Sequence, residues 1–268
     1  MISHRHAKAN NRYEPDYDPS QPNSHVTYLD ANNLYGWTMS QALPVDGFRW
    51  LEKEEFEHLN INYVSDDSED GYILDVDLDY PSELHDRHNE YLLVLEKMKV
   101  TEDMLSPYAK QLLEELEPKE TSTEKLIPNL HSKEKYVIHY RNLKLYLSLG
   151  MKLTKIHRVM TFKQQPWLKA YIDFNTQKRK IANNEFEKDF LKLMNNAVFG
   201  KAMENLRKRL LVQLVNNHSK ARRLTSKPTF HAFRIFNEDI VAVHMLKQRL
   251  YPNRPIYVGF SILTYQRF

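Results

Sequence analysis

Residues 71–80 alternate between two kinds of side chain, and this pattern constrains the fold more than any other in the chain. One set is Tyr72, Leu74, Val76, Leu78 and Tyr80, and the other is Ile73, Asp75, Asp77 and Asp79. Successive side chains of a β-strand point to opposite faces, so the alternation predicts a strand with one buried face and one solvated face. The three carboxylates are then expected on the solvated face as structural residues. A metal nuclease built on Asp75 and Asp77 is an alternative, but it would need a further Glu or His with a Lys nearby, and none is placed convincingly.

The segments before residue 165 predict a mixture of short strands and helices. Residues 1–24 are polar and predict an irregular lead-in, and residues 92–116 predict a surface excursion with helical pieces, interrupted by Pro107. A helix over 141–149 is expected to end at Gly150, the residue type that commonly terminates helices. Further elements are expected as a strand at 26–30, a turn and a short helix after it, an acidic helix at 51–59 and a strand at 155–162.

After Pro166 the pattern becomes helical over a long range. One helix is expected to run to about residue 184 and a second over 185–209, so the two can fold back as a hairpin. The remaining segment predicts short strands with one helical turn, namely strands at 211–215, 229–236, 240–243 and 256–258 and a helix at 245–249. His4, His6, His85 and His88 show no metal-binding spacing, and we expect them at the surface or in turns.

Charge is distributed unevenly along the chain. The 268 residues carry a net charge of only +3, contain 41% hydrophobic residues, enough for a core, and lack cysteine, so disulfides and thiolate metal sites are excluded. Basic residues concentrate over 178–223, whereas 52–57 and 65–70 are acidic. A nucleic-acid groove and a solvated basic face explain the basic region equally well.

Two further segments combine residue types that suit nucleotide chemistry. The apolar run at 26–29 ends in Asp30 and is followed by an Asn-Asn-Leu-Tyr-Gly turn, which places a carboxylate at the tip of a strand, where a metal can be held. Lys192, Asn196 and Phe199 are spaced i, i+4, i+7, so on a helix a cation, an amide and an aromatic ring share one face. Such a face suits a nucleotide.

These segments resemble, in the right order, two motifs of the family B DNA polymerases. Residues 30–36 (Asp-Ala-Asn-Asn-Leu-Tyr-Gly) are similar to D-x-x-S-L-Y-P, and residues 192–200 (Lys-Leu-Met-Asn-Asn-Ala-Val-Phe-Gly) are similar to K-x-x-x-N-S-x-Y-G. Their surroundings resemble the protein-primed branch of bacteriophages, linear plasmids and Maverick/Polinton-type elements. The resemblance implies an α+β fold, a partial polymerase palm of antiparallel sheet with a helical fingers hairpin. It divides the chain into a lead-in at 1–24, the palm front with an insertion at 25–165, the fingers at 166–210 and a return to the palm at 211–268.

The resemblance also implies roles for individual residues. Asp30 would be catalytic and, with the backbone carbonyl of Ala31, would hold Mg²⁺ or Mn²⁺ for two-metal nucleotidyl transfer. Tyr35 would stack beneath the incoming sugar and exclude a 2'-hydroxyl. Lys192 would clamp the triphosphate. The remaining nucleotide-binding residues would be Arg179 or Lys180 on the phosphates, Asn196 and Phe199 near the base, and Gly200 where a close approach is needed.

The chain departs from the family pattern in several places. Asn33, Gly36, Ala197 and Phe199 stand where Ser, Pro, Ser and Tyr are commoner, and Phe199 keeps the ring without the hydroxyl. The second metal-binding motif, Asp-Thr-Asp-Ser, is absent from the sequence. The expectation is therefore a truncated or decayed mobile-element copy that is inactive as an isolated chain, and 264–268 is expected to read through into sequence unrelated to the polymerase.

The expected partners follow from the same resemblance. They are a DNA template-primer, deoxynucleotides and a terminal priming protein, at an intracellular site such as a nucleus or a place of viral or plasmid replication, with no membrane involved. The rival hypothesis is a non-catalytic nucleic-acid-binding module that uses the basic helix pair alone. A helix capped by Gly200, with Lys192 on its solvated face, would be the purely structural explanation of the second motif.

Overall fold

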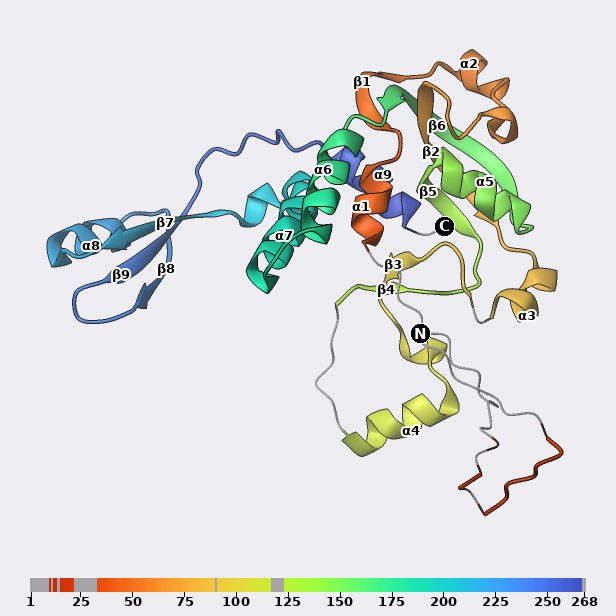
Figure 1. Ribbon diagram of the computed structural model, residues 1–268, viewed down its shortest axis with the longest axis horizontal. Coiled ribbons are helices and arrows are strands. Elements are labelled where there is room, and N and C mark those ends of the chain that lie inside the picture. The colour runs from red at the N-terminus through yellow and green to blue at the C-terminus, as the bar shows by residue number, and fades with distance from the viewer. Residues whose placement is uncertain are drawn as a thin grey trace. The chain divides into compact units, whose positions relative to one another are not determined.

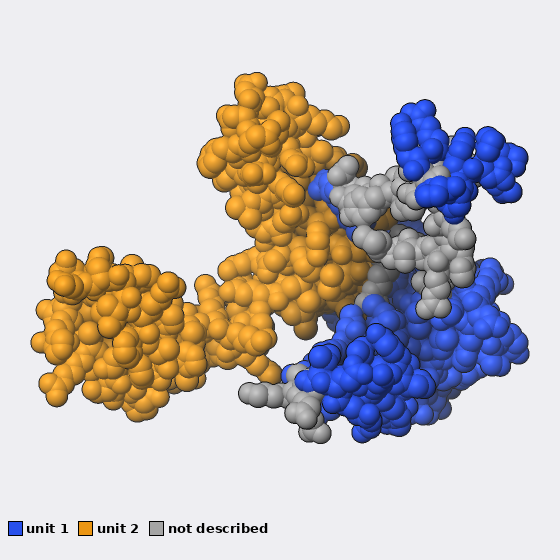
Figure 2. All heavy atoms as spheres, turned by 90° about the horizontal axis from the view of Figure 1, so that it is seen from below, with its two compact units in different colours: residues 1–34, 44–165, 267–268 blue, residues 35–43, 166–266 orange. Residues whose placement is uncertain are grey.

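The computed structural model describes residues 10, 12–13, 15–21, 33–89, 91–116 and 123–266. The chain divides into two compact units (Figure 2). Unit 1 comprises residues 1–34, 44–165 and 267–268, and unit 2 comprises 35–43 and 166–266. Both units combine helices with antiparallel strands, which confirms the predicted α+β class. Among the described helices, none has the length and apolar character required to cross a bilayer.

Unit 1 is built on a four-stranded sheet with the order β1-β6-β2-β5 (Figure 1). Its central strand β2 pairs antiparallel with both β5 and β6, so that Asp75 lies opposite Val137 on one side and Arg158 on the other. The predicted strand at 71–80 is therefore confirmed, and the strand predicted at 155–162 proves longer. The bounds are β1 Leu43–Trp50, β2 Asp70–Asp79, β5 Lys133–His139 and β6 Lys152–Gln165.

One face of this sheet carries the core of unit 1. Leu74, Val76 and Leu78 pack with Leu143 and Tyr146 of helix α5 (Tyr140–Ser148). The helix beside the sheet is visible in Figure 1. Gly150 follows α5 with φ 103°, a left-handed conformation that favours glycine, which confirms its predicted role at the end of the helix.

The opposite face of β2 is not solvated as the alternation predicts. Asp75 is only 8% exposed and forms an ion pair with Arg158 at 2.9 Å. Asp77 pairs with His157 at 2.7 Å, and Asp79 accepts a hydrogen bond from Ser132 at 2.8 Å. Cross-strand partners thus compensate these carboxylates one by one. This arrangement supports the structural role and removes the basis for a nuclease built on Asp75 and Asp77.

Short elements fill the rest of unit 1. Pro107 begins helix α4 rather than interrupting one, because the first helical position needs no N–H donor. His88 is buried, contrary to the surface position expected, and its Nδ1 lies 2.9 Å from the hydroxyl of Tyr80. The elements are α2 Lys53–Glu57, η1 Ile61–Tyr63, η2 Ser82–Leu84, α3 His85–His88, β3 Glu96–Met98, η3 Glu102–Met104, α4 Pro107–Leu116 and β4 Lys125–Ile127.

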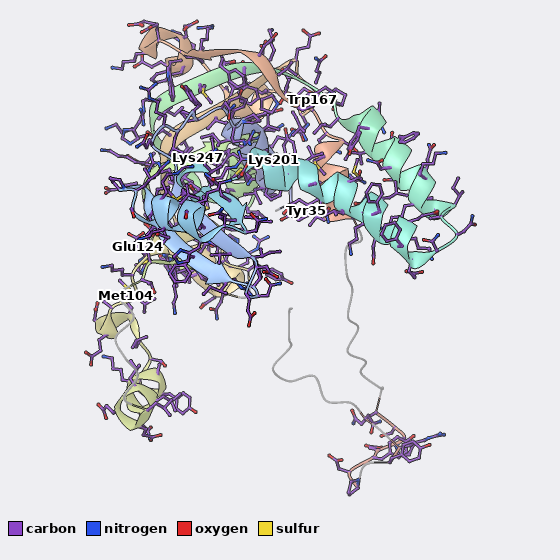
Figure 3. The ribbon with its side chains drawn as sticks, turned by 90° about the vertical axis from the view of Figure 1, so that its left-hand side faces the viewer. Tyr35, Met104, Glu124, Trp167, Lys201 and Lys247 are labelled. Atoms are coloured by element: carbon purple, nitrogen blue, oxygen red, sulfur yellow. The ribbon has the colours of Figure 1, made fainter. Side chains whose placement is uncertain are left out.

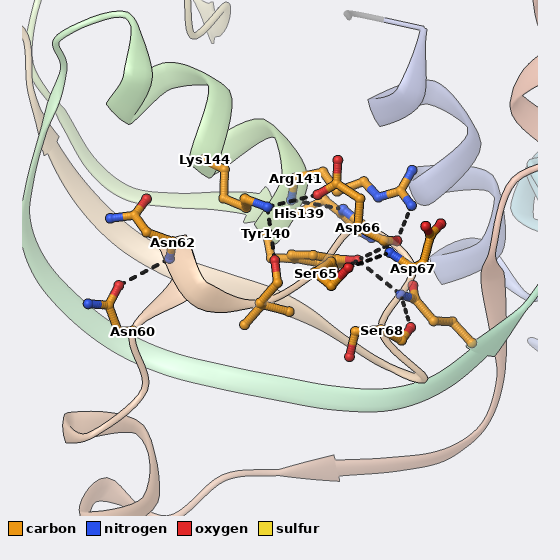
Figure 4. A network of polar contacts seen from close by, with 12 residues as sticks. Asn60, Asn62, Ser65, Asp66, Asp67, Ser68, His139, Tyr140, Arg141 and Lys144 are labelled. Carbon is orange, nitrogen blue, oxygen red and sulfur yellow. Dashed lines mark hydrogen bonds and ion pairs between the residues drawn. The ribbon is translucent and has the colours of Figure 1, made fainter.

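The acidic loop before β2 is held against the start of α5 (Figure 4). Lys144 Nζ donates to the carbonyl oxygen of Val64 and to Asp66 Oδ1, both at 2.9 Å. The Arg141 guanidinium donates to the carbonyl oxygen of Asp66. The Tyr140 hydroxyl donates to the carbonyl oxygens of Ser65 and Asp66 at 3.4 and 3.3 Å. The backbone of this loop and the carboxylate of Asp66 are therefore held by hydrogen bonds from one helix.

Unit 2 begins with a helical core. Its buried residues are Met39, Leu43, Leu168, Ile172, Val258, Ile262 and Tyr265. The helices are α1 Leu34–Met39, α6 Lys169–Lys180, α7 Glu185–Ala202 and α9 Ile256–Tyr265. The short helix expected after the first motif is confirmed as α1. The second long helix ends at Ala202 rather than at 209, and the 3-10 turn η4 (Leu206–Lys208) follows it.

The end of unit 2 differs from the strand predicted at 256–258. Residues 256–258 begin helix α9 instead of forming a strand. Thr264 and Tyr265 are buried, and the Tyr265 hydroxyl donates to the carbonyl oxygen of Ala42 at 2.8 Å. These two residues therefore pack in the fold of unit 2, and the expectation that 264–268 is unrelated to the polymerase stays a prediction.

Unit 2 also contains a three-stranded antiparallel sheet with the order β7-β9-β8. The strands are β7 Leu210–Val215, β8 Phe230–Ile235 and β9 Val241–Leu246, so the predicted strands at 211–215, 229–236 and 240–243 are confirmed. The helix predicted at 245–249 is wrong, because β9 continues through Met245 to Leu246. Helix α8 (His218–Thr225) was not predicted, although Asn217 caps it by accepting hydrogen bonds from the N–H groups of Ser219 and Lys220.

His139 makes the stability of unit 1 depend on pH. The side chain is fully buried, and this burial lowers its pKa from 6.5 to about 3. At a pH between about 3 and 6.5, His139 is therefore protonated in the unfolded chain and neutral in the folded chain. Stability is therefore expected to fall as the pH drops below 6.5, by at most about 1.4 kcal/mol per pH unit from this group.

Replacing His139 with Asn, which does not titrate in this range, should reduce that dependence between pH 6.5 and 4. The variant should be less stable than wild type at pH 7.5, because a smaller side chain leaves a cavity. Urea-induced unfolding at a series of pH values measures both effects, with His131→Asn at an exposed position as the control. An unchanged pH slope in His139→Asn would contradict the assignment.

Candidate functional site

The helical hairpin of unit 2 provides the frame for the candidate site. Helices α6 and α7 are joined by residues 181–184, as the sequence predicts, and Asn184 caps α7 by accepting a hydrogen bond from Glu187 N. Between the helices, Asn175 Nδ2 donates to Asn195 Oδ1 at 2.8 Å, and both amides are buried. The Tyr171 hydroxyl donates to the carbonyl oxygen of Met194 at 3.3 Å. These bonds fix how the two helices align along their length.

The structure brings the two sequence motifs into direct contact. The ring of Tyr35 on α1 lies against the ring of Phe199 on α7, with centroids 4.8 Å apart and planes tilted by 38°. Figure 3 labels Tyr35 in this region. Both side chains are half-buried at the edge of the helical core. Two aromatic residues that lie far apart in the chain thus form one apolar surface at the edge of the helical core.

Lys192 and Asn196 lie on the same face of α7 as Phe199, as the spacing predicts. The Lys192 side chain is exposed and forms no hydrogen bond or ion pair with any described residue. Asn196 is half-buried, and within the described ranges its side chain has no hydrogen-bond partner. The side-chain oxygen of the neighbouring Asn195, in contrast, accepts the hydrogen bond from Asn175. The two consecutive asparagines therefore differ in role, and Asn196 keeps its amide available.

Arg179 and Lys180 lie in the exposed last turn of α6. The pKa of Glu185 at the start of α7 is lowered, first by Lys188 and also by the charge of Arg179, which places Arg179 near the tip of the hairpin. The structure does not bring either cation into contact with Lys192, so their approach to a shared phosphate remains a prediction.

Three cations surround one carboxylate beyond the end of α7. Glu204 pairs with Lys201 at 2.9 Å, with Arg254 at 2.8 Å and with Arg209 at 3.5 Å. Hydrogen bonds from Lys201 and Arg254 lower the pKa of Glu204 to about 2. Part of the basic segment 201–209 is therefore neutralised inside the fold. Lys201 and Glu204 are three residues apart, but nothing in the sequence pattern links Arg254 to them, because Arg254 follows the small sheet and Glu204 precedes it.

Gly200 lies inside α7, which continues to Ala202, so it is not a helix cap. The cap expected at Gly200 in the structural explanation of the second motif is therefore wrong, whereas the exposed Lys192 agrees with that explanation. A Cβ atom built at Gly200 would meet nothing within 4 Å. Glycine inside a helix costs about 1 kcal/mol relative to alanine, and the described residues give no steric reason for it. The predicted role of Gly200 in a close approach by another molecule therefore stays a prediction.

The predicted metal ligands Asp30 and Ala31 lie outside the described residues, as does the strand predicted at 26–30. Over the part of the chain that the structure describes, no three His, Cys, Asp or Glu side chains gather in a way that would hold a metal ion. The predicted site residues that the structure describes all belong to unit 2, namely Tyr35, Arg179, Lys180, Lys192, Asn196, Phe199 and Gly200.

Comparisons with known proteins find similarity among solved structures. No protein-family model and no curated protein matches the chain. The orthorhombic crystal form of Phi29 DNA polymerase matches with 15% identity and a TM-score of 0.42, over 88% of this chain and 34% of that one. The ternary complex of Phi29 DNA polymerase with primer-template DNA and incoming nucleotides matches with 14% identity and a TM-score of 0.42, over 88% and 33%. This chain therefore spans about a third of those chains, and similarities at this level transfer no residue role, activity or ligand.

Gly200 offers a direct test of whether the fold itself requires glycine. Gly200→Ala should raise the free energy of unfolding by about 0.5–1 kcal/mol, because alanine restricts the unfolded chain and favours the helix. The matched reverse change, Ala197→Gly at an exposed position of the same helix, should lower it by a similar amount. Urea titration of the full chain measures both. A destabilised Gly200→Ala variant would show that the fold requires glycine at this position.

Proposed function

We propose that the chain is part of a DNA-directed DNA polymerase of the family B type and binds a deoxynucleotide on the α1–α7 surface of unit 2. The observation that carries the proposal is the contact between Tyr35 and Phe199, which joins the two polymerase-like motifs at 4.8 Å. The sheet of unit 1 would correspond to the front of the palm and the α6–α7 hairpin to the fingers. Primer-template DNA would be the second partner, and a terminal protein would prime synthesis.

Each residue of the surface has a role that its chemistry supports. Tyr35 and Phe199 present aromatic rings on which the sugar and the base can stack. Lys192, exposed and unpaired among the described residues, supplies a positive charge for the triphosphate. Asn196 offers both a donor and an acceptor for the nucleotide. Gly200 leaves room for a base pair to approach the helix backbone.

Nucleotidyl transfer also requires divalent ions, which the family resemblance assigns to Asp30 and the carbonyl oxygen of Ala31. Oxygen ligands of this kind suit Mg²⁺ or Mn²⁺. Such ions would activate the primer hydroxyl and neutralise the leaving pyrophosphate. No cluster among the described residues adds ligands to this pair, so the residue-level proposal for the described part concerns binding and positioning of the nucleotide.

Nucleotide binding separates this proposal from the rival, a module that binds nucleic acid without a nucleotide site. The full chain should bind dATP in the presence of Mg²⁺, measured by isothermal titration calorimetry. Lys192→Ala should weaken binding by about tenfold, since a charge-assisted contact contributes about 1.5 kcal/mol or more.

Lys220→Ala serves as the matched control, because it removes the same charge from an exposed position on α8 and should leave the dATP affinity unchanged. Equal loss in both variants would indicate a general charge effect. Binding of DNA with no detectable dATP binding would instead support the non-catalytic module.

A further inference from the structure

A groove in unit 1 lies where strand β1 ends beside a longer neighbour. The N–H of Leu51 still bonds to the carbonyl oxygen of Val159 on β6, and the chain then turns into helix α2. Strand β6 extends further, back to Lys152, so a depression of about 360 Å³ forms between α2 and this part of β6. Leu51, Phe56 and Ile156 provide its apolar lining. Figure 1 shows α2 and β1 at the same end of the unit as β6.

Trp50 stands at the edge of this groove with 58% of its surface exposed. The guanidinium carbon of Arg158 lies 5.4 Å from the centre of its ring. Arg158 is itself held by Asp75 at 2.9 Å, and Asp75 is buried in the sheet. Asp75 thus positions the Arg158 guanidinium, which makes a cation–π contact with the indole of Trp50. A large aromatic surface is in this way kept rigid and open to solvent.

The charges lining the groove have one sign. Lys53, Lys155 and Arg158 are lining residues, and no Asp or Glu is among them. Lys53 has a weak surface partner in Glu57 at 3.5 Å, whereas Lys155 is exposed and forms no ion pair with a described residue. The groove therefore combines an apolar floor, an exposed indole and positive charge, and an occupant must complement all three.

We propose that this groove binds a single strand of nucleic acid, with one base stacked on Trp50 and the neighbouring phosphate on Lys155. A volume of about 360 Å³ accommodates one base with part of its sugar. Stacking on an exposed aromatic ring beside cations is the usual way in which proteins hold single strands without reading their sequence. A duplex would not fit, because its base faces are covered by stacking. An acidic peptide would satisfy the charge but not the flat indole.

The proposal is independent of the nucleotide site, because every residue of the groove belongs to unit 1 and none lies on α1 or α7.

The fluorescence of Trp50 can report binding to the groove directly. The chain contains three tryptophans, so Trp37→Phe with Trp167→Phe leaves Trp50 as the only one. The full-length variant is titrated with a ten-residue oligothymidylate. The Trp50 emission should decrease until the site is saturated, because a base stacked on the indole quenches its fluorescence.

Two substitutions make the test specific. Lys155→Ala should lower the slope of log affinity against log salt concentration by about 0.7, the value for one lost phosphate contact on a single strand. The control Lys99→Ala, at an exposed position away from the groove, should leave the slope unchanged. Should the single-tryptophan variant not fold, Trp50→Ala in the native background should weaken the binding of a fluorescein-labelled strand by about fivefold or more, measured by anisotropy.

Three results would overturn the proposal. The first is the absence of quenching, whether the labelled strand binds elsewhere or not at all. The second is equal quenching by a duplex or by polyglutamate, which would indicate a nonspecific or peptide-binding surface. The third is loss of quenching in Lys192→Ala, because the signal would then report the α7 site, and the nucleotide-binding proposal would stand while this one fell.

Discussion

The buried hydrogen bond between Asn175 and Asn195 fixes the alignment of α6 against α7, and the candidate site depends on that alignment. An amide that is buried without a partner costs about 1–3 kcal/mol, so a slip of one helix along the other is strongly disfavoured. Asn195 is turned toward α6, and Asn196, about 100° further around α7, is turned away from Asn175. Phe199 contacts Tyr35, and Lys192 stays exposed.

Two residues of the α1–α7 surface, Gly200 and Lys192, contribute little to the stability of the fold and are exposed to solvent. Gly200 weakens the helix at a position where the described residues leave space for a side chain, and Lys192 keeps its charge without a described partner. Lys201, Arg209 and Arg254 of unit 2, in contrast, are neutralised by Glu204. A glycine inside a helix departs from a local rule, and the proposed nucleotide contact would explain it.

Local patterns in the sequence predict much of the fold. The alternation at 71–80 predicts β2, Gly150 predicts the end of α5, and the periodicity after Pro166 predicts the hairpin. The failures have physical causes. The solvated face expected for Asp75 is covered because β6 supplies Arg158, a contact between distant segments. The segment 256–258 is rich in β-formers, yet α9 forms because the helical core buries Val258 with Ile262 and Tyr265.

The candidate site was predictable in part for the same reason. The i, i+4, i+7 spacing on α7 needs only helix geometry, and the structure bears it out. The choice between Asn195 and Asn196 and the contact of Phe199 with Tyr35 depend on tertiary packing. The cluster around Glu204 depends on it as well, because Arg254 returns to it from the far side of the small sheet. Spacing along the chain carries no information about such pairings.

The central claim is that the α1–α7 surface binds a nucleotide, and photochemical crosslinking tests it most directly. The full chain is irradiated with 8-azido-dATP in the presence of Mg²⁺, and the modified peptides are identified by mass spectrometry. We expect the label on peptides that contain residues 33–37 or 192–200, and excess dATP should prevent it. Labelling confined to unit 1 or to the β7-β9-β8 sheet, or labelling that excess dATP does not reduce, would contradict the account.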